Sequence, residues 1–284
     1  MSDKIKNLAV RTISGVVLCI VILGAIGWSQ WSFGLLLALL VVGGMTEFYA
    51  LALKRGIAPQ RLIGVVAGLV IFALNFMVVS NDLRILELGS ARTLFGYGLA
   101  FALLVIPMMF FCELWRKREN PAANIGVTLM GVFYVALPFS LMLYFPIITT
   151  DAWSPEVMFG YIFIVWANDV FAYLVGMTLG RHRLFERISP KKSWEGFFGG
   201  VAGAVAFGLI MAHYLSASMT AWAGLALVVS VSAVLGDLVE SMFKRAADVK
   251  DSGAVIPGHG GVLDRFDAML LSAPFVFVYM LFVM

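Results

Sequence analysis

The chain has 284 residues, of which 61% are hydrophobic and 13% are charged, and its mean hydropathy is +0.95. Its apolar runs repeatedly reach the roughly 20 residues that cross a bilayer as a helix, which excludes a water-soluble globular protein and indicates an integral membrane protein. The two cysteines, Cys19 and Cys112, lie in separate apolar runs without metal-ligand spacing, so neither a disulfide framework nor a zinc site is indicated.

Apolar segments separated by charges, Gly, Pro and Asn predict an all-α, polytopic membrane protein with about nine transmembrane helices. The first follows three basic residues, as a signal peptide does. No small-residue cleavage site is evident and further spans follow, so we interpret it as a span. The predicted spans are residues 8–28, 32–53, 61–80, 93–113, 125–148, 157–180, 196–216, 219–240 and 266–284.

The distribution of basic residues predicts the orientation of these spans. With the N-terminus in the cytoplasm, every Lys and Arg except Arg84 and Arg92 falls on the cytoplasmic side, as the positive-inside rule requires. The longest cytoplasmic loops are then residues 181–195 and 241–265. We therefore divide the chain into N-terminal transmembrane helices, 1–120, and a C-terminal region, 121–284, that carries both loops and the expected catalytic groups.

Acidic side chains gather near the loop 241–265. Asp237, Glu240, Ser241 and Lys244 share one face of a helix if the eighth span continues to that point, and acids within a span are costly unless they are paired, hydrated or bound to a cation. A plain ion pair between Glu240 and Lys244 is the alternative for that pair. Such an ion pair accounts less well for the presence of Asp237, which lies one turn deeper in the span.

A second acidic pair lies at the start of the last span. Asp264 follows a flexible Gly-His-Gly-Gly run, whose amides can approach an anion, and Asp267 follows Asp264 by three residues. Carboxylates beside cations suit a magnesium-bound polyphosphate, although Asp267 could instead satisfy free amides at the start of the helix. His259 has two interpretations, a phosphate-binding or basic group and a structural hydrogen-bonding residue.

Two further segments carry polar groups. Asp169 lies inside the sixth span, where an acid indicates a functional site, and the following loop reads Ser-Pro-Lys-Lys-Ser-Trp-Glu-Gly. Lys191 and Lys192 lie between a turn and a helix start, a suitable place to hold phosphate. Glu47 is an acid within the second span to which no role can be assigned. P-loop and Gly-x-Ser-x-Gly motifs are absent from the sequence, so a P-loop ATPase or a serine hydrolase is not indicated.

The segment SMFKRAADVKDSGAVIPGHGGVLDRFD, residues 241–267, resembles the C-terminal signature of the CDP-diglyceride synthetases, or phosphatidate cytidylyltransferases. The segments SPKKSWEG and WANDVFAY are also similar to that family, and the resemblance covers most of residues 160–284. It implies a nucleotidyltransferase of phospholipid biosynthesis that transfers a cytidylyl group from CTP to phosphatidic acid and gives CDP-diacylglycerol and pyrophosphate.

The resemblance also suggests roles for individual residues. It implies Mg²⁺ held by Asp237 and Asp264, with Asp267 as a third ligand, and leaves open a second cation. We expect Asp237, Asp264, Lys244 and Arg245 to carry the catalysis. Binding of the two substrates is expected from Asp169, Ser189, Lys191, Lys192, Ser241, Lys250, His259, Gly260, Gly261 and Arg265.

The expected partners are CTP, phosphatidic acid and membrane lipids, without nucleic acid, and the resemblance suggests a homodimer. The expected location is the bacterial cytoplasmic (inner) membrane, with the active site on the cytoplasmic side. The acidic residues also suggest two alternative functions. A CDP-alcohol phosphotransferase also uses paired aspartates, but its Asp-Gly-x-x-Ala-Arg motif is absent. A transporter or channel could use Glu47, Asp169 and Asp237 as an ion path, although acids clustered at one face do not form a path across the membrane.

Overall fold

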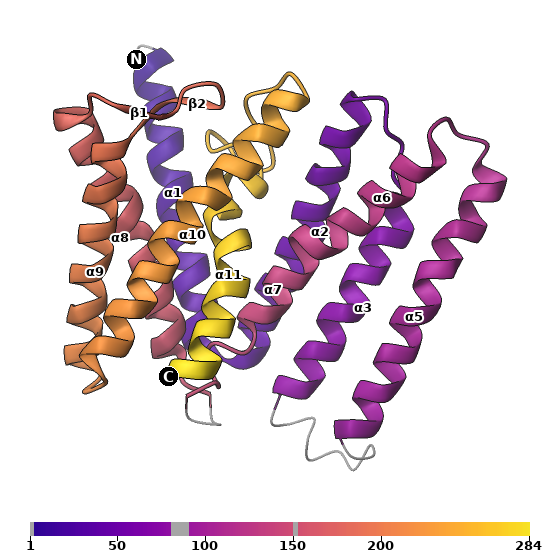
Figure 1. Ribbon diagram of the computed structural model, residues 1–284, viewed down its shortest axis with the longest axis horizontal. Helices are drawn as coiled ribbons and strands as arrows, with labels where there is room; N and C mark the ends of the chain where they lie inside the picture. The colour runs from indigo at the N-terminus through magenta and orange to yellow at the C-terminus, as the bar shows by residue number, and fades with distance from the viewer. Residues whose placement is uncertain (1–2, 81–90, 150–152) are drawn as a thin grey trace. The chain divides into compact units, whose positions relative to one another are not determined.

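The computed structural model describes residues 3–80, 91–149 and 153–284, and these confirm an all-α membrane protein (Figure 1). Within them, eight helical segments are long and apolar enough to cross a membrane. A further long helix, α5 (Ala91–Arg116), matches the predicted span 93–113. Helices suit this sequence because a helix pairs its own backbone N–H and C=O groups, which lipid cannot do.

The first helices are α1 (Asp3–Trp28), α2 (Gln30–Lys54) and α3 (Arg61–Val79). A continuous helical segment then comprises α6 (Pro121–Gly131), a π-helical turn η1 (Val132–Ala136) and α7 (Leu137–Met142). It ends before residue 148, where the predicted span ended, and turns follow. The later helices are α8 (Pro155–Leu179), α9 (Trp194–Tyr214), α10 (Met219–Ala246) and α11 (Leu263–Val283).

Two boundaries differ from the prediction in a way that matters for the site. Helix α10 continues six residues past the predicted end at 240, and α11 begins at Leu263 instead of 266. The polar stripe of α10 is therefore helical throughout, as its i, i+3, i+4 spacing requires. The predicted loop 181–195 is partly ordered as an antiparallel hairpin of β1 (Arg183–Phe185) and β2 (Ser189–Ser193).

The chain forms two compact units. One comprises residues 1–143 and 246–265, and the other comprises residues 144–245 and 266–284. In the first unit, Tyr49 is fully buried, donates a hydrogen bond to the Thr128 carbonyl at 2.8 Å, and lies against Gly64 and Gly131. Such small residues let helices approach closely where lipid provides no hydrophobic driving force.

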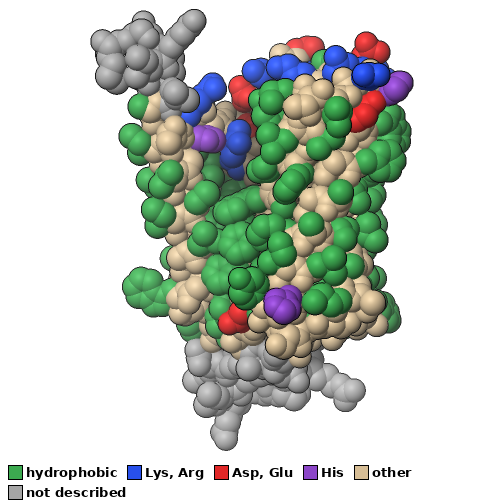
Figure 2. Space-filling view, turned by 90° about the vertical axis from the view of Figure 1, so that its left-hand side faces the viewer, with side chains coloured by type: hydrophobic (Ala, Val, Ile, Leu, Met, Phe, Trp, Pro, Cys, Tyr) green, Lys and Arg blue, Asp and Glu red, His purple; other side chains and the backbone are tan. Residues whose placement is uncertain are grey.

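In the second unit, α8 and α9 pack along a face rich in glycine. A Cβ added at Gly200 would lie 2.7 Å from the Asn168 side chain, and one at Gly199 would meet Val175 at 2.5 Å. Figure 2 shows hydrophobic side chains along the length of the surface that faces the viewer, and Lys, Arg, Asp and Glu gathered mainly at one end. The β1–β2 hairpin connects α8 to α9 and lies at one end of both helices (Figure 1).

Candidate functional site

Three carboxylates meet in the second unit. Asp237 and Glu240 from α10 and Asp267 from α11 each offer an oxygen, and these oxygens all lie within 4.8 Å of one another. Glu240 is 1% exposed, and the other two are partly buried. Three partly or fully buried carboxylates at this spacing repel one another and lose hydration, so they require nearby positive charge.

A glycine on α10 permits this meeting. A Cβ at Gly236 would lie 2.7 Å from the Asp267 carbonyl oxygen, so only a glycine lets the two helices approach at that level. The neighbouring Asp237 is thereby brought toward the first turns of α11. Close approach of backbones through a glycine is a general device of membrane helices, and here it assembles the charged groups.

Two lysines supply part of the positive charge. The Lys192 ammonium lies 2.5 Å from Asp237, and the Lys244 ammonium lies 2.5 Å from Glu240, one turn away on α10. Ser241 donates a weaker hydrogen bond to Asp237 at 3.2 Å. Three carboxylates and two ammonium groups leave one negative charge, and carboxylate oxygens are ligands that Mg²⁺ prefers, so the donor set fits a divalent cation.

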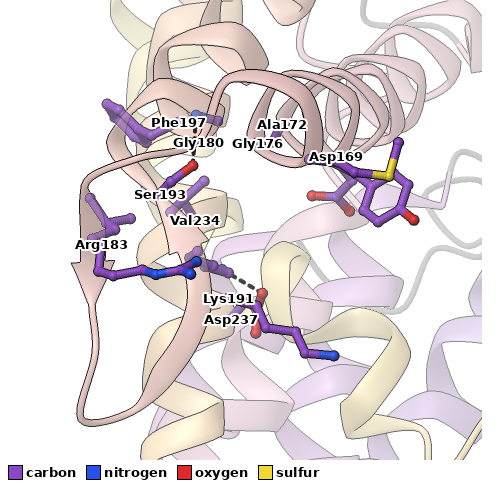
Figure 3. A pocket seen from close by; sticks show the side chains of 15 residues that line it. Asp169, Ala172, Gly176, Gly180, Arg183, Lys191, Ser193, Phe197, Val234 and Asp237 are labelled. Atoms are coloured by element: carbon purple, nitrogen blue, oxygen red, sulfur yellow. Dashed lines mark hydrogen bonds and ion pairs between the residues drawn. The ribbon is translucent and has the colours of Figure 1, made fainter.

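Asp237 also lines a pocket of about 560 Å³ between α8, the hairpin, α9 and α10 (Figure 3). Polar walls come from Asp169, Arg183, Lys191 and Lys192. Apolar walls come from Tyr173, Met177, Phe197 and Val234. A pocket of this size suits a small-molecule ligand, and its mixed lining suits one with both phosphate and hydrocarbon parts.

The hairpin that carries the lysines is closed by Glu195. Its carboxylate accepts hydrogen bonds from the backbone amides of Arg181 and His182 at 3.1 to 3.3 Å and lies 2.6 Å from the His182 ring. Ser193 caps α9 by accepting from the Gly196 amide at 3.2 Å. The Ser-Trp-Glu-Gly part of the motif therefore has a structural task, which is to hold Lys191 and Lys192 at the pocket.

The glycine-rich part of the segment 241–267, residues 247–262 between α10 and α11, is here called the signature loop. It lies in the first unit, and two acids accept hydrogen bonds from it. One Asp264 oxygen accepts from the Ser252 amide at 2.9 Å, the Ser252 hydroxyl at 3.0 Å and the Gly261 amide at 2.8 Å. Gly260 has φ of +84°, a left-handed conformation that favours glycine, and a Cβ there would lie 2.6 Å from Asp264.

Glu47 is the second of these acids, and sequence reasoning could not assign it a role. It is 6% exposed; one oxygen accepts from the Val262 amide at 2.9 Å, and the other from the Ser252 hydroxyl at 2.9 Å and the Leu263 amide at 3.0 Å. A Cβ at Gly253 would lie 2.5 Å from this carboxylate. In the sequence, Glu47 stands out as an acid in an apolar span. Its hydrogen-bond partners cannot be inferred from that pattern, because they lie more than 200 residues away along the chain.

The predicted site residues fall into three groups. The pocket and the carboxylate cluster of the second unit bring together Asp169, Lys191, Lys192, Asp237, Ser241, Lys244 and Asp267. The first unit holds Lys250, His259, Gly260, Gly261, Asp264 and Arg265. Ser189, in β2, and Arg245, near the end of α10, neither line this pocket nor belong to the cluster, so their binding and catalytic roles stay predictions.

Glu240 and His259 make contacts that bear on their predicted roles. Glu240, considered for an ion pair, makes that pair and also belongs to the carboxylate cluster. The His259 ring lies 2.9 Å from the Ser14 hydroxyl on α1, and its carbonyl accepts from Arg265, so the loop histidine has structural partners. The phosphate-binding role of His259 stays a prediction.

These observations describe a polytopic membrane protein with a cluster of three carboxylates beside a basic, partly apolar pocket. The chain belongs to the cytidylyltransferase family, whose model matches residues 9–283. It is similar to proteins named phosphatidate cytidylyltransferase: that of Synechocystis is 33% identical over 275 residues, 88% of each chain. Those of Brucella abortus and Haemophilus influenzae are each 32% identical, over 96% of this chain and 93% and 99% of their own.

Proposed function

We propose that this protein transfers the cytidylyl group of CTP to phosphatidic acid, which forms CDP-diacylglycerol and releases pyrophosphate. Family membership and the names of the relatives support this choice of substrates. The structural observation that carries it is the carboxylate cluster, which shares Asp237 with a pocket lined by cations and apolar side chains. A lipid substrate needs cationic side chains beside its phosphate and apolar side chains beside its hydrocarbon chains.

The reaction is a phosphoryl-type displacement. An oxygen of the lipid phosphate attacks the α-phosphorus of CTP, the bond from that phosphorus to the oxygen bridging to the β-phosphorus breaks, and pyrophosphate leaves with the electron pair. The lipid phosphate is already ionised at neutral pH, so a strong base is not required. The protein contributes positioning and positive charge where negative charge accumulates.

The basic side chains of the pocket are the groups we assign to phosphate binding. Lys191, Lys192 and Arg183 lie on the hairpin and line the pocket, so they can contact the triphosphate or the lipid phosphate. Lys192 is already paired with Asp237, which orients its ammonium group. Asp169, on the α8 wall, is assigned to substrate binding, where it could accept hydrogen bonds from a ribose or base.

We assign the divalent cation, Mg²⁺, to Asp237, Glu240 and Asp267. When bound, it would neutralise charge on the triphosphate and on the departing pyrophosphate. Glu240 replaces Asp264 in the set predicted from the sequence, because the Asp264 carboxylate accepts three hydrogen bonds within the signature loop. A direct metal role for Asp264, and a second cation, remain predictions.

The location is proposed from charge. The basic residues that flank the spans support an active site on the cytoplasmic side of the bacterial inner membrane. A homodimer is expected from the family resemblance alone. Membrane embedding lets the acyl chains remain in lipid while the head group reaches the pocket.

The test is a reaction with purified protein in detergent. Phosphatidic acid is supplied with CTP, ATP, GTP or UTP, with and without Mg²⁺, and both pyrophosphate and the lipid product are measured. We expect CDP-diacylglycerol with CTP and Mg²⁺ only. If folded protein forms no product with any nucleotide, the proposal is wrong, and ion flux in proteoliposomes would then test the transporter alternative.

A further inference from the structure

A second cavity lies in the first unit, at the ends of α2, α3 and α5, and takes no part in the proposed reaction. Its volume is about 730 Å³, which is large enough for a ligand. Three arginines, Arg61, Arg116 and Arg118, line it, and none of its lining residues is acidic.

The charge of this cavity is not fully neutralised by the protein. Arg116 forms an ion pair with the buried Glu113 at 2.7 Å. Arg61 and Arg118 make no ion pair within the part of the chain that the structure describes, and both are exposed. The cavity therefore presents two guanidinium groups for an anion, and Arg is well suited to phosphate because its donors form a planar fork.

Apolar side chains stand beside these guanidinium groups. Leu62 and Trp115 also line the cavity, and they are 77% and 76% exposed. Trp and Arg at the ends of apolar helices are typical of the level of lipid head groups. A free phosphate would leave these apolar surfaces uncovered, whereas a phospholipid would cover them with its acyl chains.

Gln60 also lines the cavity and is held in place by hydrogen bonds. Gln60 is 4% exposed, and its Nε2 donates to Glu113 at 2.7 Å and to the Met109 carbonyl at 2.8 Å. Its Oε1 is buried and has no hydrogen-bond partner among the described residues. Since this atom is closed off from solvent, Gln60 fixes the cavity wall through its Nε2 hydrogen bonds and leaves ligand contact to the arginines.

We propose that this cavity binds one anionic glycerophospholipid from the surrounding membrane. The lipid phosphate contacts Arg61 and Arg118, and the acyl chains lie along Leu62 and Trp115. The proposal is independent of the proposed reaction, because these residues all belong to the first unit and do not line the Asp237 pocket.

Native mass spectrometry of the delipidated protein in detergent tests the proposal, with phosphatidylglycerol, phosphatidylcholine or inorganic phosphate added. Phosphatidylglycerol is anionic, carries head-group hydroxyls and is not a substrate of the proposed reaction. We expect one tightly retained phosphatidylglycerol, and roughly 30-fold weaker retention in the double variant Arg61→Gln/Arg118→Gln.

The matched control is Arg55→Gln/Lys117→Gln, which removes the same charge from neighbouring positions that do not line the cavity. Equal retention in the two double variants would mean that lipid binds to general surface charge and would overturn the proposal. Equal retention of phosphatidylcholine, or binding of inorganic phosphate with the same affinity as the lipid, would also overturn it. Unchanged thermal unfolding of each variant confirms that loss of binding is not loss of fold.

Discussion

At the scale of single residues, some buried acids of this protein pair with lysine side chains, and others accept hydrogen bonds from the backbone. Glu240 contacts Lys244 and belongs to the carboxylate cluster, so its charge is compensated by side chains. Glu47 accepts from two backbone amides and one hydroxyl. Both acids lie in apolar helices and are almost fully buried, so their partners alone distinguish their functions.

For Glu240→Gln, we expect the Mg²⁺ concentration that gives half-maximal activity to rise by about 10- to 100-fold, because a charged ligand is replaced by a neutral amide. The comparison is Lys244→Met, which removes the ion pair but keeps all three carboxylates. Mg²⁺ titrations of both variants under saturating CTP measure the effect. If Glu240→Gln lowers activity with an unchanged Mg²⁺ requirement, Glu240 serves only the ion pair.

For Glu47→Gln, we expect the free energy of unfolding to fall by about 2–4 kcal/mol, because hydrogen bonds to a charged acceptor are lost and an amide N–H faces backbone donors. Turnover should fall with it, since the signature loop loses its anchor. Thermal unfolding and initial rates are compared with Glu119→Gln, an exposed acid of the same unit. Indistinguishable variants would contradict the anchoring role.

At the scale of elements, the hairpin and the helix ends position the charges. The β1–β2 hairpin holds Lys191 and Lys192, and Ser193 and Glu195 join the hairpin to α9. Helix α10 brings Asp237 and Glu240 to α11 because Gly236 permits close packing. The elements that carry site residues are thus fixed by backbone contacts that a pattern of charges in sequence does not reveal.

Opening the hairpin should impair substrate binding more than folding. For Glu195→Ala, we expect the KM for CTP or phosphatidic acid to rise by about tenfold or more, because the amides of Arg181 and His182 lose their acceptor and the lysines lose their fixed position. Steady-state kinetics measure this. Glu186→Ala, in the same hairpin but with an exposed side chain, is the control, and an equal KM in the two variants would refute the role of Glu195.

At the scale of the whole molecule, the signature segment 241–267 serves both compact units. Residues 241–245 and 266–267 belong to the unit with the pocket, and residues 246–265 belong to the unit that contains α2. Glu47, near the start of the chain, therefore supports a motif near its end. Helix α2 thus contributes a direct structural contact to the signature segment.

The predicted orientation is a property of the whole chain and can be tested by cysteine labelling. In a background without Cys19 and Cys112, we expect Ser216→Cys, in the turn between α9 and α10, to react with a membrane-impermeant maleimide in intact cells. Arg187→Cys, in the hairpin, should react only after permeabilisation, because the predicted orientation places it on the cytoplasmic side. The reverse pattern would place the N-terminus outside.

Apolar runs of bilayer length and the segment 241–267 are local features, so the amino-acid sequence alone predicted the membrane class, most of the helices and the family. It also singled out Asp237, Lys192 and Asp267 as charged groups near helix ends. Only the tertiary structure decided that Glu240 completes the carboxylate cluster, that Glu47 anchors the signature loop and that Asp264 accepts hydrogen bonds within it. The physical reason is that hydropathy is read along the chain, whereas charge compensation and backbone hydrogen bonding depend on partners that folding brings close.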